Sequence, residues 1–297
     1  MATALTLTRV QAVSGPRAVG QWQRGWRRFA RNRLAVACAA FLALFIAVVG
    51  AAPLVSPYQP NVGNLVEALD PPSAAHPLGV DGNGRDLMTR LLYGGRVSLV
   101  VGILSMLLSL ALGVVVGALS GYYGGAVDTI LMRFTEAMLS LPTFFLVLAI
   151  LAFLPGGGTI PLVIGVTSWM PIARLVRSEF LRWKAIEFVE AARTIGAGDA
   201  RIIVQHVMPQ AMGAIVVAAT LGVAHAILTE SAISYLGLGI QPPTPTWGNM
   251  LLEAQLYAFD RPMLAVYPGL MVLVTVVCFN AIGDGLRDAF DPRMRDY

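Results

Sequence analysis

Three histidines and two cysteines are the residues of this sequence best suited to bind a metal ion or to attack a substrate. His76, His206 and His225 are far apart along the chain and fall on different expected elements. Cys38 and Cys278 each lie in an apolar run, without a partner at metal-ligand or disulfide spacing. A serine, histidine and acid set cannot be argued either. The sequence therefore predicts no catalytic residue and no metal site.

A glycine-rich stretch, GVDGNGRD at residues 79–86, has the composition of a phosphate-binding loop. It lacks the Gly-Lys-Ser/Thr ending, in which the lysine and the hydroxyl reach the phosphates and Mg²⁺. We interpret it as a structured turn rather than a nucleotide site.

A polar segment, EFVEAARTIGAGDARIIVQHVMPQA at residues 187–211, interrupts the otherwise apolar second half of the chain. Apolar or small residues recur at i, i+3, i+4 and i+7, which places them on one face of a helix. The expected face comprises Phe188, Ala191, Ala192 and Ile195. Its small side chains would let another surface approach closely.

A turn and a second short helix are expected after this face. Gly196 is a helix stop, Asp199 can cap the second helix, and Pro209 suits the first turn of the next long helix. The segment therefore reads as a helix–turn–helix elbow. The pattern alone leaves open whether the elbow is a plain connector on its own bundle or a surface for another protein.

Composition places the elbow in a membrane protein. Of the 297 residues, 56% are hydrophobic and 13% are charged, whereas a soluble domain carries about 25% charged residues. The net charge of +4 comes without a dense basic face, which argues against nucleic-acid binding. We expect an all-α integral membrane protein.

Six stretches are long and apolar enough to cross a bilayer core, which needs roughly 20 residues of helix. The charge-free run 137–173 is too long for one span, and LPGGGTIP at residues 154–161 divides it. The expected spans are Leu34–Val55, Val97–Gly121, a third that starts near Val127, Thr159–Arg182, Gln210–Leu228 and Met263–Ile282.

The distribution of arginine gives the expected orientation. The first 33 residues hold seven arginines and no acid, and the positive-inside rule makes that tail cytoplasmic. Six spans then place the elbow and the C-terminus on the same side. The expected organisation is a cytoplasmic tail at 1–33, a first span at 34–55, an external loop at 56–96, a core at 97–284 that includes the cytoplasmic loop 183–209, and a cytoplasmic tail at 285–297.

The elbow resembles the EAA loop of ABC-importer permeases. Glu190-Ala191-Ala192 is followed by Gly196, Ile203 and Pro209, on the expected cytoplasmic side. In that family the loop forms the coupling helix, which sits in a cleft of the cytoplasmic ATPase. The resemblance assigns contact with the ATPase to Phe188, Glu190, Ala191, Ala192, Arg193, Ile195, Gly196, Ile203 and Pro209.

Segments 76–99, 124–142 and 228–251 resemble the C-type permease of the dipeptide, oligopeptide and nickel importer branch, and the likeness extends over roughly residues 25–297. It implies a type I permease fold with six transmembrane helices in the inner membrane. It also implies a B-type permease, two ATPases that carry the ATP and Mg²⁺, and an extracytoplasmic binding protein. This chain would then bind no cofactor or nucleic acid and have no catalytic site of its own.

The resemblance implies a dipeptide or oligopeptide as the substrate, with a nickel complex or another small solute as the alternative. A secondary carrier that works alone is a further alternative. It would need its own ion or proton site, and buried ionisable residues are few in this sequence.

Four ionisable residues are candidates for lining the pathway or contacting the second permease. Arg133 and Glu136 stand three residues apart near the inner end of the third span, and His225 and Glu230 belong to the outer part of the fifth. A snorkelling ion pair and helix-end solvation explain them equally well. Trp247 is expected either to anchor in headgroups or to help dock the binding protein.

Cysteine accessibility tests the expected orientation. Asn61→Cys lies in the expected external loop and Gly198→Cys in the expected cytoplasmic elbow. A membrane-impermeant maleimide added to intact cells should modify position 61 and should reach position 198 only after lysis. Labelling of position 198 in intact cells would show that the orientation is wrong.

Overall fold

The computed structural model describes residues 21–154 and 156–290. Residues 1–20 and 291–297 of the two expected tails lie outside this part. The described chain is built from helices, with a single isolated β-bridge between Val80 and Asp86. The predicted all-α fold is therefore confirmed.

Five helical segments are long and apolar enough to cross a membrane, and a sixth is counted if a bent pair of helices forms one span. The long segments are α2 (Arg33–Gly50), α4 (Leu87–Tyr123), residues 157–184 with α7 (Ile160–Thr167) and α8 (Met170–Lys184), residues 199–235 with α11 (Met208–Tyr235), and α13 (Met263–Phe290). The bent pair is α5 (Gly125–Leu139) and α6 (Thr143–Phe153). The shorter elements are α1 (Gln21–Phe29), α3 (Ala52–Val55), η1 (Leu65–Glu67), η2 (Gly157–Thr159), α9 (Glu187–Thr194), α10 (Asp199–Arg201), the π-helical η3 (Ile202–Val207), α12 (Trp247–Ala254) and η4 (Gln255–Tyr257).

Most of the expected spans differ from the structure in their bounds, since α2 ends at Gly50 and α11 and α13 run on to Tyr235 and Phe290. The third is not continuous, because α5 and α6 meet at an angle of 83°. Pro142 stands at the N-cap of α6 and has no backbone N–H to continue α5. The second begins earlier than expected, because the side chain of Asp86 caps α4 and accepts from the backbone N–H of Thr89. The last ten residues of the expected external loop are thus helical.

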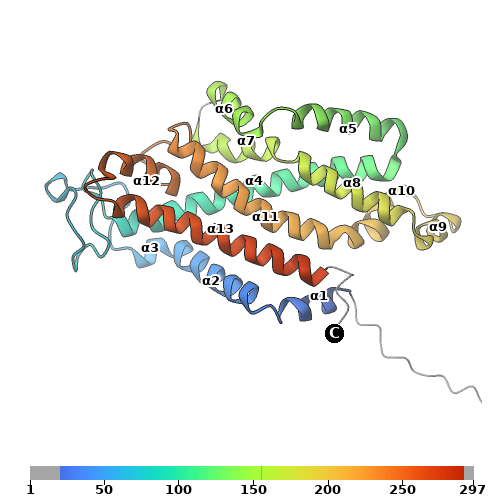
Figure 1. Cartoon of the computed structure of the whole chain (residues 1–297), viewed down its shortest axis with the longest axis horizontal. Coiled ribbons are helices and arrows are strands. Elements are labelled where there is room, and N and C mark those ends of the chain that lie inside the picture. The colour runs from blue at the N-terminus through green and yellow to red at the C-terminus, as the bar shows by residue number, and fades with distance from the viewer. Residues whose placement is uncertain (1–20, 155, 291–297) are drawn as a thin grey trace, which may run out of the picture.

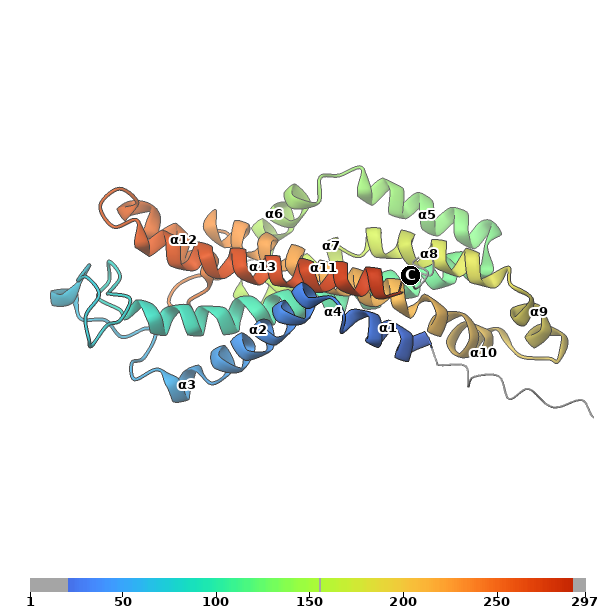
Figure 2. The same cartoon turned by 60° about the horizontal axis from the view of Figure 1, so that its bottom comes forward.

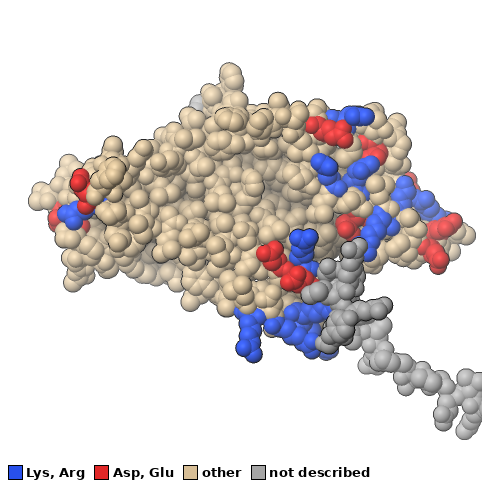
Figure 3. Space-filling model, viewed as in Figure 1, with Lys and Arg blue, Asp and Glu red and all other residues tan. Residues whose placement is uncertain are grey.

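The helices run roughly along one long axis, and the charged residues gather at its two ends (Figures 1 and 3). Helix α12 and the loop before α4 form one end, whereas α1, α9 and the end of α13 form the other in both cartoon views (Figures 1 and 2). On the face drawn in Figure 3 the surface between the ends carries almost no charge. A helix bundle that spans a bilayer needs such an uncharged surface where it contacts hydrocarbon.

Glycines let α8 pack closely on α4. Gly113, Gly117 and Gly121 recur every four residues and face α8. A Cβ added at Gly117 would lie 2.5 Å from the carbonyl oxygen of Ala173 and 2.7 Å from Cβ of Val176. Small residues at this spacing are the usual device for close helix contact in membranes.

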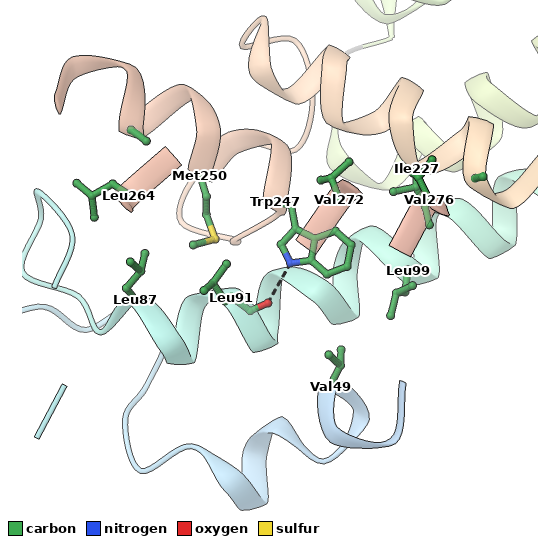
Figure 4. Packing of buried hydrophobic residues seen from close by; sticks show 12 residues of the cluster. Val49, Leu87, Leu91, Leu99, Ile227, Trp247, Met250, Leu264, Val272 and Val276 are labelled. Atoms are coloured by element: carbon green, nitrogen blue, oxygen red, sulfur yellow. Dashed lines mark hydrogen bonds between the residues drawn. The ribbon is translucent and has the colours of Figure 1, made fainter. Parts of the chain in front are cut away.

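Trp247 anchors α12 against α4 at the α12 end of the bundle (Figure 4). The side chain is fully buried, and its Nε1 donates to the carbonyl oxygen of Leu91 at 3.1 Å. Val49, Met250 and Leu264 belong to the same apolar cluster. Both expectations for Trp247 are therefore wrong, because a buried indole reaches neither headgroups nor a docked protein.

Glu230 joins three elements beside this cluster. Its carboxylate is fully buried and accepts from the hydroxyl of Ser98 on α4 at 3.1 Å and from that of Ser234 at 2.8 Å. The Ser98 hydroxyl in turn accepts from the backbone N–H of Trp247 at 3.3 Å. Helix-end solvation, one of the expectations for Glu230, is thus wrong.

Gly117→Leu should disrupt the contact between α4 and α8. The added side chain overlaps backbone atoms of α8, so we expect a loss of about 1–3 kcal/mol or more in the free energy of unfolding. Gly50→Leu is the matched control, since a Cβ at Gly50 meets nothing within 4 Å. The thermal midpoint of the detergent-purified chain measures both, and equal midpoints would contradict the packing role.

Glu230→Leu should destabilise the bundle by about 1–3 kcal/mol, because it leaves buried hydroxyls without their acceptor. Glu230→Gln keeps an acceptor oxygen and should lose less. Thermal unfolding of the two variants under one detergent condition tests this order. A leucine variant as stable as the parent would show that the hydroxyls find other partners at no cost.

Candidate functional site: the α9 elbow and an apolar cavity

Helix α9 presents two different faces. Val189 and Ala192 are 1% and 5% exposed and pack on their own chain, with Ile202 and Val207 of η3. Ala191 lies on the exposed side of the helix.

The exposed side of α9 forms an apolar strip, which we call the α9 strip. Its members are Phe188, Ala191 and Ile195. The expectation that Ala192 shares one surface with these residues is wrong, because its methyl group is taken up by the chain's own core.

Gly196 ends α9 as predicted. Its φ of +85° is left-handed, and its backbone N–H donates to the carbonyl of Arg193 at 2.9 Å. The N–H of Ala197 donates to the carbonyl of Ala192 at 3.0 Å, which completes a Schellman motif. A Cβ at Gly196 would meet nothing within 4 Å, so the demand for glycine comes from the backbone angle alone.

Tyr122, at the C-terminal end of α4, ties the elbow to the bundle. Its hydroxyl donates to Oδ1 of Asp199 at 2.6 Å, and the guanidinium of Arg193 lies 5.4 Å from the centre of its ring. Lys184 donates to the backbone carbonyl of Tyr122. The hydrogen bond with Tyr122 raises the pKa of Arg193 further above its usual range. Asp199 does not cap the second helix as expected, since Gly198 takes the N-cap position without a side-chain bond.

The second half of the elbow leads directly into α11. Ile203 is half-buried in η3, and Pro209 is exposed in the first turn of α11. Glu190 is exposed on α9 beside the α9 strip. The nine residues expected to contact the ATPase thus lie on one continuous elbow, with Ala192 turned inward.

An ion pair that was not predicted from the sequence braces the same end of the bundle. Asp128 on α5 accepts from Nε and Nη2 of Arg177 on α8, at 2.5 and 2.6 Å. The hydroxyl of Ser120 on α4 also donates to Asp128. The pair is 49 residues apart in sequence, so no local pattern could have revealed it.

Charged groups at the opposite end, also missed, fix the loop before α4 to α12. Arg85 donates to Asp81 at 2.8 Å and to Glu253 at 2.7 Å, and the buried Arg90 donates to Glu253 at 3.0 Å. The carboxylate of Asp81 also accepts from the backbone N–H groups of Asn83 and Arg85. Residues 79–86 therefore form the structured turn that the sequence predicted.

An apolar cavity of about 330 Å³ lies among α4, α6, α7, α8 and α11. It is lined by Met106, Ser109, Thr143, Ile164, Thr167, Ser168, Pro171, Ile172, Leu175, Ala218, Leu221, Gly222, His225 and Ala226. Its polar groups are hydroxyls and one imidazole, and none of these lining residues is an acid, a lysine or an arginine.

His225 is the one candidate pathway residue that reaches this cavity. Its Nδ1 lies 3.2 Å from the hydroxyl of Thr229, which also donates to the carbonyl oxygen of His225 at 2.9 Å. Arg133 and Glu136 form an exposed ion pair of 3.2 Å on α5. Glu230 is buried and bonded to Ser98, away from the exposed pair on α5. The four candidate residues therefore do not form one site.

The chain matches two protein families. Residues 113–296 match the binding-protein-dependent transport system inner membrane component, and residues 20–72 match the N-terminal transmembrane domain of oligopeptide transport permease C. Three similar proteins illustrate the relationship. They are the glutathione transport system permease protein GsiD of Pectobacterium atrosepticum (39% identical, covering 92% of both chains), the oligopeptide transport system permease protein OppC of Haemophilus influenzae (41%, 92% of this chain and 89% of the relative) and the dipeptide transport system permease protein DppC of Bacillus subtilis (41%, 92% and 86%).

A solved structure has the same fold. A chain of the inward-facing MetNI methionine ABC transporter superposes with a TM-score of 0.55 at 20% identity, over 69% of this chain and 98% of the other. The type I permease fold expected from the sequence is thus confirmed. The chain belongs to the family of inner membrane components of binding-protein-dependent transport systems.

Proposed function

We propose that this chain is a permease subunit of an ATP-driven importer of dipeptides or oligopeptides. Similarity to proteins of named substrate supports the substrate class. Proteins 38–41% identical over 92% of the chain are named for oligopeptide, dipeptide or glutathione transport, and all three substrates are peptides. The cavity is consistent with this, since hydroxyls and an imidazole can hydrogen-bond a peptide backbone.

The family implies a membrane, an ATPase and a binding protein as partners. The finer composition is part of our proposal: a second permease of the B type, two ATPases that carry the ATP and Mg²⁺, and an extracytoplasmic binding protein. The α9 strip and both termini then face the cytoplasm of a cell with this chain in its inner membrane. No catalytic role falls to this subunit.

The arrangement of the elbow suggests how the ATPase would move the bundle. Movement of α9 passes to α4 through Tyr122, which contacts both Arg193 and Asp199, and to α11 through the shared apolar cluster of α9 and η3. Helices α4 and α11 also line the cavity. ATP binding can change which side the cavity faces only if the ATPase contacts α9 differently in the two states.

Ala191→Arg tests the ATPase contact. Ala191 is exposed in the α9 strip, so the variant should fold and insert, whereas a long charged side chain would have to be desolvated in a packed cleft. We expect peptide uptake to fall at least tenfold, with loss of the co-purified ATPase or with ATP hydrolysis that no longer depends on peptide. Uptake of a labelled dipeptide, ATPase activity and membrane level are measured together.

Ala192→Arg and Glu187→Gln are matched controls for this test. Ala192 is buried, so its variant should fail earlier, with a lower membrane level or thermal midpoint. Glu187 is exposed at the first turn of α9, outside the α9 strip, and its variant should transport normally. If Ala191→Arg keeps the ATPase and transports at the parental rate, the elbow is a connector. If no peptide is taken up by the parent chain with its partners, the substrate class is wrong.

A further inference from the structure

Helix α1 is fixed against the end of α13, ahead of the first span. Gly25 faces Phe290 so closely that an added Cβ would lie 2.9 Å from the ring. Phe29 is 8% exposed and shares a cluster with Ala35 and Ala289. One side of this short helix is therefore taken up by the bundle, and the orientation of the other side is set.

The other side of α1 and the link into α2 carry an aromatic ring and three cations, which we call the α1 patch. Its members are Trp26 and Arg27 on α1, Arg31 between α1 and α2, and Arg33 at the start of α2. Trp26 is 69% exposed and stacks on Phe29, with ring centres 5.9 Å apart. None of the ion pairs found among the described residues includes these arginines. Figure 3 shows basic side chains at the lower edge of the molecule, where Figure 1 labels α1.

The apolar surface of α2 begins directly beside the patch. Leu34 is 67% exposed, and Phe41 and Leu44 continue an exposed apolar surface along α2. Along the chain, cations and an indole are thus followed at once by side chains suited to acyl chains. A bilayer presents the same order, with anionic phosphates above an interface that favours tryptophan and hydrocarbon below it.

We propose that the α1 patch binds acidic phospholipid headgroups of the leaflet at this end of the bundle. A guanidinium offers paired donors that match two oxygens of a phosphodiester. Among the described residues these three guanidiniums have no acidic partner, so they leave a positive charge for the lipid to neutralise. An acidic protein surface would satisfy the arginines but would not explain the exposed apolar side chains that adjoin them. Because α1 is packed on α13, lipid bound here is held against the bundle.

Lipid retention by the purified protein tests this proposal. The full-length chain, with the subunits that co-purify, is reconstituted in equal amounts of phosphatidylglycerol and phosphatidylcholine at low salt, and retained lipids are counted by native mass spectrometry. Each arginine near an anionic surface contributes about a fivefold preference. Arg27→Gln/Arg31→Gln/Arg33→Gln should therefore lower the preference for phosphatidylglycerol by tenfold or more.

Two matched variants separate the patch from general charge. Arg27→Lys/Arg31→Lys/Arg33→Lys keeps the charge and should keep most of the preference. Arg96→Gln/Arg261→Gln removes exposed cations toward the opposite end and should change it little. If the triple glutamine variant fails to insert, the single Arg27→Gln and Arg31→Gln variants should each lower the preference by about fivefold.

Three results would overturn the proposal. One is an unchanged preference for phosphatidylglycerol in the glutamine variants. Another is displacement of the lipid by millimolar inorganic phosphate, which would indicate a site for free anions. A third is loss of a co-purifying subunit while lipid retention stays the same, which would make the patch a protein contact.

Discussion

Close contact along α4 is the constraint on which the rest of the structure depends. In a bilayer, apolar surface gains little by leaving lipid for other apolar surface, so helices must approach closely enough to gain van der Waals contact. Helix α4 contacts α2, α5, α7, α8, α11, α12 and α13. It achieves this with small residues: Gly102 faces Ile227 of α11, Gly95 faces Trp247 of α12, and Gly117 faces α8.

Buried polar groups then fix which helix lies beside which. Glycine contacts alone would allow neighbouring helices to slide, whereas the carboxylate of Glu230 has to meet Ser98 and Ser234 at one register. At the end of the bundle near α9, Asp128 and Arg177 do the same for α5 and α8. A buried polar or charged group that loses its partner costs free energy, so each of these contacts penalises any other register.

The sequence predicted features that depend on composition and local pattern. The six apolar stretches, the stop at Gly196 and the turn at residues 79–86 follow from rules that involve only near neighbours. The long-range pairs, such as Asp128 with Arg177 or Arg85 with Glu253, could not be predicted, because each joins residues more than 45 positions apart. Trp247 was misplaced for the same reason: its position after a proline-rich loop suggested the surface, and the pocket that buries it belongs to α4 and α2.

The two alanines of the EAA motif show how one pattern can carry two physical roles. Periodicity places Ala191 and Ala192 on adjoining sides of α9, and only the tertiary packing decides which side is covered. Ala192 is small because η3 packs against it, and a larger side chain there would move the elbow away from Tyr122. Ala191 faces solvent and meets no such limit within this chain. If α9 sits in a cleft of the ATPase, the limit on Ala191 comes from that cleft, so the first alanine is constrained by the partner and the second by the permease itself.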